Sequence, residues 1–393
     1  MSEPEGAWAL LTPEELAWKE TCRAFAEEVI RPVAPVCDRE NRFPAEVHEA
    51  AWARGLMHPC LPRALGGGGR SWRSLAVGGE ELAAVCAPTA FTLGFNHGAL
   101  RPVLHAGDEA QRARFVTDLL ARRGYASLCL TEPDASGSNL LAVRALARAD
   151  GDGWVLSGTK CMVGNGTVAE LFLVLADTEE RGRRRGPSFF AVPRGPGVRV
   201  GPNTDKLGFR CVPTPTVAFE DVRLDAGCLV GAPGQAEQVL LETLDFIRFG
   251  GAAVILGIVV GALRDLVPWL EARRVAPDEP LVAKSDVQLT LGGLFAEVQA
   301  VRLLMWRAAD LLDQGRPCAT ETAAAKYLAS ELAVRATNAC AQLYGWRGVD
   351  GDWPAAKRLR DARATTIYEG TSQVQQLGLA RALRRSVRAG GWL

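Results

Sequence analysis

The feature that most constrains the fold is a change of pattern in the middle of the chain. Up to about residue 124 the apolar residues have helical spacing. From 125 to about 231 short β-rich runs alternate with Gly, Pro and Asp turns, and beyond 235 long helical segments return. Strands between two blocks of helices predict an α+β chain of three parts. We expect an N-terminal α-helical domain over residues 1–124, a middle antiparallel β-domain over 125–234 and a C-terminal four-helix bundle domain over 235–393.

The helical parts carry start and stop signals. Thr12 and Glu15 form a capping-box pattern around Pro13, which predicts a helix start, and Pro32 and Pro35 predict the end of that helix. Further helices of the first part are expected at 43–55, 73–86, 89–105 and 109–121. The long helices of the last part are expected at 238–270, 282–314, 321–344 and 371–388. Their Gly and Ala content suits close packing and association into a dimer or a tetramer.

Composition excludes several classes of function. The 393 residues are 48% hydrophobic and 23% charged, as in a globular protein with a large core. The formal net charge is zero, so neither a nucleic acid nor a membrane surface is expected as a partner. The N-terminus has no signal-peptide pattern, so we expect a cytoplasmic protein. None of the ten cysteines forms a Cys-x-x-Cys pair, and no metal is expected. His97 and His105 lie on apolar helices and are interpreted as packed or capping.

A carboxylate near the C-terminus stands between an aromatic residue and a glycine, in Tyr368-Glu369-Gly370. Gly370 permits unusual backbone dihedrals. Thr371 or Ser372 caps the helix that follows, whose free N–H groups attract anions and phosphates. One short loop therefore places a carboxylate beside a site for a phosphate-bearing ligand. The alternative is a surface loop with a solvated glutamate and an ordinary cap.

Four more stretches belong with this loop. Residues 130–139 read Leu-Thr-Glu-Pro-Asp-Ala-Ser-Gly-Ser-Asn, and residues 158–166 read Gly-Thr-Lys-Cys-Met-Val-Gly-Asn-Gly. Residues 208–223 contain Gly-Phe-Arg and then Val-Ala-Phe-Glu-Asp-Val-Arg, and residues 244–248 read Leu-Asp-Phe-Ile-Arg. Together with the stretch 360–373, these runs resemble, in order, the signatures of the acyl-CoA dehydrogenase family. The resemblance covers almost the whole chain and implies that family's fold, with FAD as cofactor.

The resemblance also implies which residues bind FAD. In the family, the 130–139 loop holds the flavin, the 158–166 loop covers it, and residues after the catalytic glutamate contact it. An arginine after the first long helix and a Gln-x-x-Gly loop reach the adenosine or a neighbouring subunit's FAD. The positions that carry these roles here are Leu130, Thr131, Gly137, Ser138, Met162, Val163, Gly164, Arg273, Gln342, Gly345, Gly370, Thr371, Ser372 and Gln373.

For the reaction, the resemblance implies that Glu369 is the catalytic base. One branch of the family takes its base from the residue before the arginine of the 244–248 stretch, but that residue is Ile247 here and cannot accept a proton. The remaining substrate contacts that the resemblance implies are Ser138, Asp245, Arg248 and Tyr368. The expected chemistry is α,β-dehydrogenation of an acyl thioester, with hydride transfer to the flavin.

Two departures from the family pattern lie near the flavin. Met162 stands where the family has an aromatic residue, and Gly164 where it has a hydroxyl near flavin N5. They leave the substrate open between acyl-CoA and a carrier-protein-bound acyl group of a biosynthetic pathway. An electron-transfer flavoprotein is the expected acceptor. Two alternatives remain: a flavin oxidase or monooxygenase on the same fold, and a non-catalytic flavin-binding relative.

Overall fold

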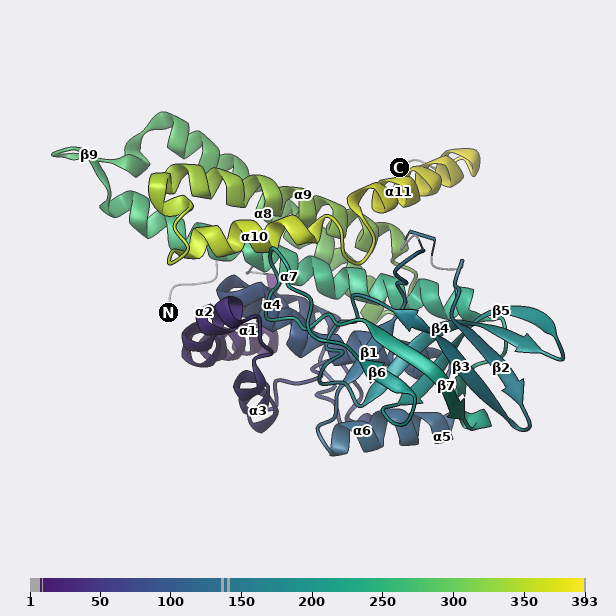
Figure 1. Cartoon of the computed structure of the whole chain (residues 1–393). Coiled ribbons are helices and arrows are strands. Elements are labelled where there is room, and N and C mark those ends of the chain that lie inside the picture. The colour runs from purple at the N-terminus through teal and green to yellow at the C-terminus, as the bar shows by residue number, and fades with distance from the viewer. Residues whose placement is uncertain (1–7, 9, 136–137, 140–141, 392–393) are drawn as a thin grey trace.

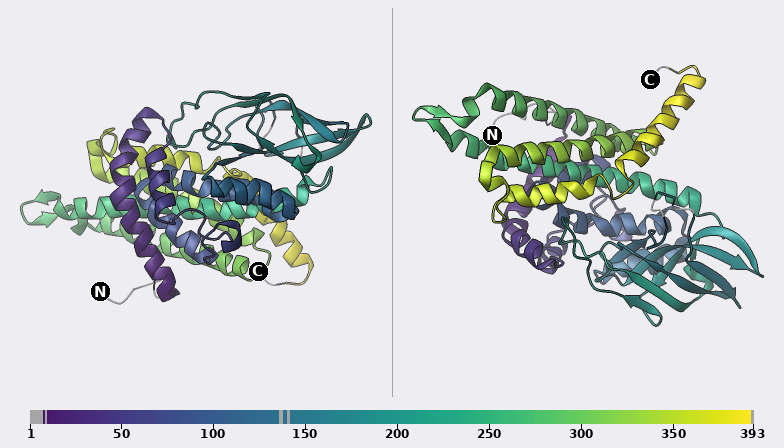
Figure 2. Two further views of the ribbon diagram at one scale, coloured as in Figure 1. Left: turned by 90° about the horizontal axis from the view of Figure 1, so that it is seen from below. Right: turned by 45° about the horizontal axis from the view of Figure 1, so that its top comes forward.

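The computed structural model describes residues 8, 10–135, 138–139 and 142–391. Helices come first, a β-sheet follows and helices return, which confirms the predicted α+β order (Figure 1). The sheet lies beside the end of the helical core, with α5 (Glu109–Arg112) and α6 (Asp118–Ala121) near it (Figure 1). Figure 2 shows the same arrangement from two further sides. One cluster of buried apolar side chains joins the N- and C-terminal helices, and a second lies around the sheet.

The first helices differ from the prediction at their prolines. The capping box at Thr12 is formed, since its Oγ1 accepts from the N–H of Glu15 at 3.2 Å and its own N–H donates to that residue's carboxylate at 3.0 Å. The chain then stays helical as far as Glu40, so the prediction that Pro32 and Pro35 end the segment is wrong. Pro32 follows a π-helical turn in this continuous helical run, Pro35 lies inside α2, and the packing of α2 against α4 holds the helix despite both prolines. The elements are α1 (Pro13–Phe25), a π-helical turn (Ala26–Ile30), α2 (Arg31–Glu40) and α3 (Ala45–Ala53).

Helix α4 (Trp72–Ala106) is two helices joined at a sharp bend. Cys86 has non-helical dihedrals, with φ −152° and ψ 101°. The rings of Trp72 and His97 stack at 5.5 Å between centroids, although residues this far apart in a straight helix are separated by about 37 Å. The two arms, 72–85 and 87–106, therefore run back along each other, close to the two helices that the sequence predicted there.

The middle part is one mixed sheet. Its strands are β1 (Ala126–Cys129), β2 (Leu146–Asp150), β3 (Gly153–Lys160), β4 (Leu171–Glu180), β5 (Arg183–Pro193), β6 (Val198–Val200), β7 (Val217–Leu224) and β8 (Leu229–Val230). The order is β6-β7-β3-β2-β4-β5-β8, with β1 on β4. We expected antiparallel pairs throughout, but β1 and β2 both run parallel to β4. The connection 130–145 makes this possible, because it crosses between two short strands that periodicity did not reveal.

The C-terminal part contains the four predicted long helices and one more. They are α7 (Ala236–Ala272), α8 (Ser285–Asp313), α9 (Ala319–Tyr344), α10 (Pro354–Thr365) and α11 (Ser372–Arg388), with a small hairpin of β9 (Arg274–Ala276) and β10 (Glu279–Pro280). The arginine-rich α10 was not predicted, and α11 projects away from the other helices (Figure 1). Helices α4 and α7 approach closely, since a Cβ on Gly257 would lie 2.5 Å from that of Ala83.

Two helices are long and apolar enough to cross a membrane by length and composition alone, namely α7 and α8. In α7, 78% of the apolar window is buried inside the protein, as in the core helix of a globular protein. It packs against α4 and α9.

Candidate active site

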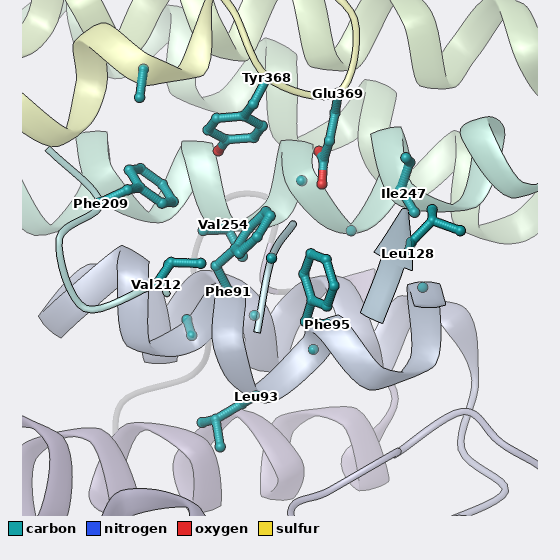
Figure 3. Close-up of a pocket in the computed structure, with 18 of the residues that line it drawn as sticks. Phe91, Leu93, Phe95, Leu128, Phe209, Val212, Ile247, Val254, Tyr368 and Glu369 are labelled. Carbon is teal, nitrogen blue, oxygen red and sulfur yellow. The ribbon is translucent and has the colours of Figure 1, made fainter. Parts of the chain in front are cut away.

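Glu369 lies in the loop between α10 and α11, above a cavity between α7 and α4 (Figure 3). The backbone at Glu369 is left-handed, with φ 55°, and Gly370 follows with φ 88°. This bend directs the carboxylate toward α7, where a Cβ on Gly251 would overlap Oε2. Oε2 has no hydrogen-bond partner among the described residues. A left-handed, bulky residue beside a glycine is the kind of strain found at functional sites.

The surroundings of Glu369 favour its neutral form. Burial raises the pKa of Glu369 to about 8, while Lys326 and Arg248 act in the opposite direction. A carboxyl group with a pKa near neutrality is suited to accept a proton, because its basicity then matches the working pH. Glu369 therefore lies in surroundings that would suit a proton acceptor, and its role as the base stays a prediction.

Lys326, on α9, was missed by the sequence analysis. Its Nζ donates to the carbonyl oxygens of Thr365 at 2.8 Å and Gly370 at 2.7 Å, so it joins the end of α10 to the loop of the base. Gln375 supports the same loop from α11, since Nε2 donates to the carbonyl oxygen of Glu369 at 3.1 Å. The signal was a lone lysine among alanines on a helix face that had to be buried.

Tyr368 forms an aromatic wall beside the base. Its ring lies edge-on to Phe91 at 5.4 Å and is tilted against Phe209 at 5.2 Å between centroids. Figure 3 shows these rings and Phe95 around the space below the carboxylate. Tyr368 lines the cavity, as the prediction of a substrate contact requires. These rings make this side of the surroundings of Glu369 apolar.

The cavity has a volume of about 770 Å³ and brings several predicted residues together. Those that line it are Leu130, Thr131, Ser138, Met162, Gly164, Tyr368, Glu369, Gly370 and Thr371. Val163 is buried directly behind this lining. Gly137, also predicted to contact FAD, lies outside the described residues.

An ion pair that the sequence analysis missed holds the first flavin loop in shape. Lys160 and Glu132 are both buried, and Nζ lies 2.9 Å from Oε1. Lys160 also donates to the carbonyl oxygen of Leu130 at 3.0 Å. Glu132 accepts from the backbone N–H groups of Arg144 at 2.8 Å and Ala145 at 2.9 Å. The loop is thereby fastened to both ends of the connection between β1 and β2 and to the end of β3.

The second flavin loop explains one departure from the family pattern. A Cβ on Gly164 would overlap the ring of Phe95. The position that carries a hydroxyl in the family therefore has no room for a side chain here, because the α4 phenyl ring fills the space. Met162, with φ 55°, is half exposed at the cavity.

Other predicted residues do not line this cavity. Asp245 and Arg248 form an ion pair at 3.2 Å on α7, with Ile247 facing the cavity between them. The hydroxyl of Ser372 donates to Glu331 at 2.6 Å, and Gln373 is exposed. Arg273, Gln342 and Gly345 are exposed at the other end of the C-terminal helices. Within one chain, the predicted adenosine contacts are therefore not assembled with the base.

The side chains that line the cavity fit a flavin. Aromatic and aliphatic side chains form most of the lining, which suits a planar apolar ring system. Thr131 and Ser138 border it on the sheet side. On the other side Thr371 caps α11 by accepting from the N–H of Val374 at 3.2 Å, and the 17-residue helix presents its N-terminus there. A flavin with a polar, phosphorylated tail matches this combination.

A carboxylate over a cavity whose lining fits a flavin points to a class of protein: flavoenzymes that dehydrogenate carbon–carbon single bonds. Family models confirm and narrow this assignment. The acyl-CoA dehydrogenase N-terminal domain matches residues 12–123, the middle domain 127–222 and the C-terminal domain 238–384. The chain belongs to the acyl-CoA dehydrogenase family, whose members are FAD-dependent oxidoreductases acting on CH–CH bonds.

Individual relatives agree with the family models. The chain is 37% identical to the short-chain specific acyl-CoA dehydrogenase of Bos taurus mitochondria over 94% of this chain and 90% of the relative. Butyryl-CoA dehydrogenase from Megasphaera elsdenii has a TM-score of 0.90 and 30% identity, covering 95% of this chain and 98% of that one. A chain from a structure of the electron transferring flavoprotein of Acidaminococcus fermentans has a TM-score of 0.91 and 30% identity, with the same coverage. A glutaryl-CoA dehydrogenase from Mycobacterium smegmatis in complex with FADH2 has a TM-score of 0.88 and 25% identity, covering 95% of each chain.

Proposed function

We propose that the protein dehydrogenates an acyl thioester between its α and β carbons, with Glu369 as the base. The observation that carries the proposal is the Glu369 carboxylate, which projects over the cavity and has one oxygen without a hydrogen-bond partner (Figure 3). Bound FAD supplies the acceptor for the β-hydride. The residues of this chain have to bind the thioester, exclude water and take the α-proton.

Each of these tasks has a candidate residue. Glu369 takes the α-proton, and its raised pKa brings its basicity toward the working pH. Tyr368 and Phe91 shield the reacting carbons from water. Removing an α-proton develops negative charge on the thioester oxygen, which needs hydrogen-bond donors. The family resemblance assigns one of these to the backbone N–H of Glu369 itself, which the bonds from Lys326 and Gln375 hold in place.

The carrier of the acyl group is part of the proposal. Relatives named for short-chain acyl-CoA support a coenzyme A thioester, and a carrier-protein thioester is the second candidate. We infer an electron-transfer flavoprotein as the acceptor, as the related chain from such a structure suggests. A homodimer or homotetramer would cover apolar side chains that are exposed on the C-terminal helices, including Leu289, Phe295, Leu328, Leu377 and Leu383.

One observation supports the alternative function of a flavin oxidase or monooxygenase. Gly164 provides no hydroxyl, and Phe95 occupies the space beside it, so the flavin neighbourhood differs from the family pattern. A monooxygenase needs no base at the position of Glu369, whereas this chain retains the base together with the contacts that orient it. Dehydrogenation is therefore the better supported function.

An anaerobic titration tests the proposal. Butyryl-CoA, or butyryl on a carrier protein, should bleach the flavin absorbance of the purified holoprotein. Glu369→Gln should abolish bleaching, by a thousandfold or more in rate, while the protein stays yellow. The carrier that bleaches identifies the physiological thioester. Bleaching at the original rate by the variant would remove Glu369 from the mechanism, and a yellow protein that no thioester bleaches would favour the oxygenase or non-catalytic readings.

A further inference from the structure

The cavity extends beyond the space that faces the base. Its lining includes Leu75, Gly78 and Gly79 on the first arm of α4, which pack beneath the second arm and α7. A Cβ added to Gly250 would lie 4.0 Å from Cδ2 of Leu75. A Cβ added to Gly94 would have no atom within 4 Å. The absence of side chains at Gly94 and Gly250 thus leaves space between α4 and α7, and the cavity reaches Trp18 and Cys22, which lie against Gly78.

Side chains from α1 and from the loop after α3 line this inner end of the cavity. Trp18 and Cys22 line it from α1, and Leu56, His58 and Pro59 line it from the loop. His97 lines it from the second arm of α4. An apolar passage that ends at two histidines differs from a cavity built only for a hydrocarbon chain, because each imidazole carries two polar nitrogens.

The two imidazoles are buried, and each has at least one ring nitrogen without a partner among the described residues. His58 and His97 are each 2% exposed. Both ring nitrogens of His58 and Nδ1 of His97 have no hydrogen-bond partner among the described residues. The ring of His97 lies between Trp72 and Phe246, and that of His58 packs edge-on against Trp52. Leaving such a nitrogen unpaired costs about 1–3 kcal/mol, so unpaired buried nitrogens require an explanation.

A third histidine provides the contrast. His48 is also fully buried, but its Nε2 lies 2.9 Å from the hydroxyl of Thr92, and it does not line the cavity. His48 thus has a partner for Nε2 but none for Nδ1, whereas among the described residues neither ring nitrogen of His58 has a partner. His58 in addition adopts φ 54°, a left-handed conformation that the loop maintains.

The state of the imidazoles defines what they can bind. Burial lowers the pKa of His58 to about 4 and that of His97 well below its usual value, so both rings are neutral at physiological pH. A neutral imidazole offers one donor and one acceptor. The guanidinium of Arg101 lies over the rings of Trp72 and Phe246 and does not line the cavity. This combination suits a neutral group that both donates and accepts, such as a hydroxyl, better than a carboxylate.

We propose that His58 and His97 are specificity residues that hydrogen-bond a hydroxyl group at the far end of the acyl chain, so that the preferred substrates are hydroxylated acyl thioesters. A half-turn of either ring exchanges its nitrogens with ring carbons without moving the ring, which brings a nitrogen to the opposite edge. The inference rests on the proposed dehydrogenation at Glu369 and deepens it by naming a class of acyl group.

The test compares matched thioesters on the complete holoenzyme. Butyryl-, hexanoyl- and octanoyl-CoA are each paired with the counterpart that carries a terminal hydroxyl, and kcat/KM is measured for all of them. If a carrier protein proves to be required, the same acyl groups are loaded on it. At one chain length the hydroxylated substrate should be preferred by about tenfold or more, because without the hydroxyl the imidazoles remain unpaired.

Variants assign the preference to the histidines. His97→Leu keeps a helix-compatible side chain of similar bulk and should reduce the preference to about onefold, mainly through KM of the hydroxylated substrate. His58→Asn serves as a second variant, because asparagine tolerates the left-handed backbone but its amide is shorter. The matched control is His48→Leu, a buried histidine that does not line the cavity, which should lower stability and leave the preference unchanged.

The outcomes separate this inference from the proposed function. If no thioester bleaches the flavin, the proposed dehydrogenation itself fails. If unsubstituted acyl chains react as well as hydroxylated ones at every length, the dehydrogenation stands and the specificity role is overturned. A preference that survives in both His97→Leu and His58→Asn also overturns it. An ordered water held by the imidazoles would produce equal rates for the two kinds of acyl chain, since a hydroxyl would then gain nothing.

Discussion

The two walls of the cavity differ in how they keep to the family pattern. We define the base wall as Glu369 with its supports on α7, α9 and α11, and the sheet wall as the loops 130–138 and 161–164. The base wall contains the Tyr-Glu-Gly-Thr run that resembles the family's signature, and it is held by Lys326, Gln375 and the absence of a side chain at Gly251. The sheet wall has changed at Met162 and at Gly164, where Phe95 fills the space. The wall of the proposed base thus keeps the pattern of the resemblance, while the sheet wall departs from it and a side chain of the neighbouring helix α4 fills the space.

The largest effect is expected from the base wall. Gly251→Val would place a side chain where the Glu369 carboxylate lies, and a displaced base costs about a hundredfold in rate for a shift near 1 Å. We therefore expect kcat/KM to fall by about a hundredfold or more with FAD still bound, measured by steady-state kinetics and flavin absorbance. Gly292→Val is the matched control, because a Cβ there has nothing within 4 Å and the helix is exposed. Unchanged kinetics in Gly251→Val would show that the carboxylate does not need this position.

A substitution in the sheet wall is expected to lower stability and FAD binding. Glu132→Gln removes the partner of the buried Lys160 and leaves an uncompensated charge, which destabilises by about 3 kcal/mol. The flavin loop should loosen, so that less FAD is retained and the midpoint of urea unfolding falls. In the fraction that still binds FAD, the dependence of kcat/KM on pH should be unchanged. Glu220→Gln is the control, since its pair with Arg199 is exposed. Full FAD retention and an unchanged midpoint would contradict the role of this pair.

The comparison also shows what a sequence can reveal. The order of helices and strands and the loop of Glu369 were predicted, because periodicity and a contiguous motif are local properties of the chain. Lys326, Gly251 and Phe95 were missed, because each acts on a residue far away in sequence and only packing brings the partners together. The parallel pairs of β1 and β2 were missed for the same reason, and the helix through Pro32 shows burial overriding a local signal.

A smaller effect is expected from Lys326→Met. The change removes two hydrogen bonds from the base loop and a positive charge that lowers the pKa of Glu369. The base must be deprotonated to act, so kcat/KM should rise with pH through the pKa of Glu369, about 8 in the free protein. Without the lysine that pKa rises, so the acid limb should move to higher pH, and the rate at neutral pH should fall about tenfold. Lys284→Met, at an exposed pair with Glu279, controls for loss of charge. If the acid limb of the pH profile does not move, Lys326 acts only by holding the loop in place and not through its charge.

The smallest effect tests the compensation between the sheet wall and helix α4. Gly164→Ser alone should weaken FAD binding, because its Cβ overlaps the ring of Phe95. Phe95→Ala alone should leave a gap beside the flavin, costing a few kcal/mol of stability. If the pair is matched, the double variant should bind FAD better than Gly164→Ser by several-fold, and its flavin reduction potential should differ from that of the original protein, since a hydroxyl now lies at that position. FAD affinity by fluorescence and the potential by dye equilibration give two readouts that do not depend on turnover. Additive effects in the cycle would mean that Phe95 and Gly164 changed independently, and the sheet wall would then have lost its hydroxyl without compensation.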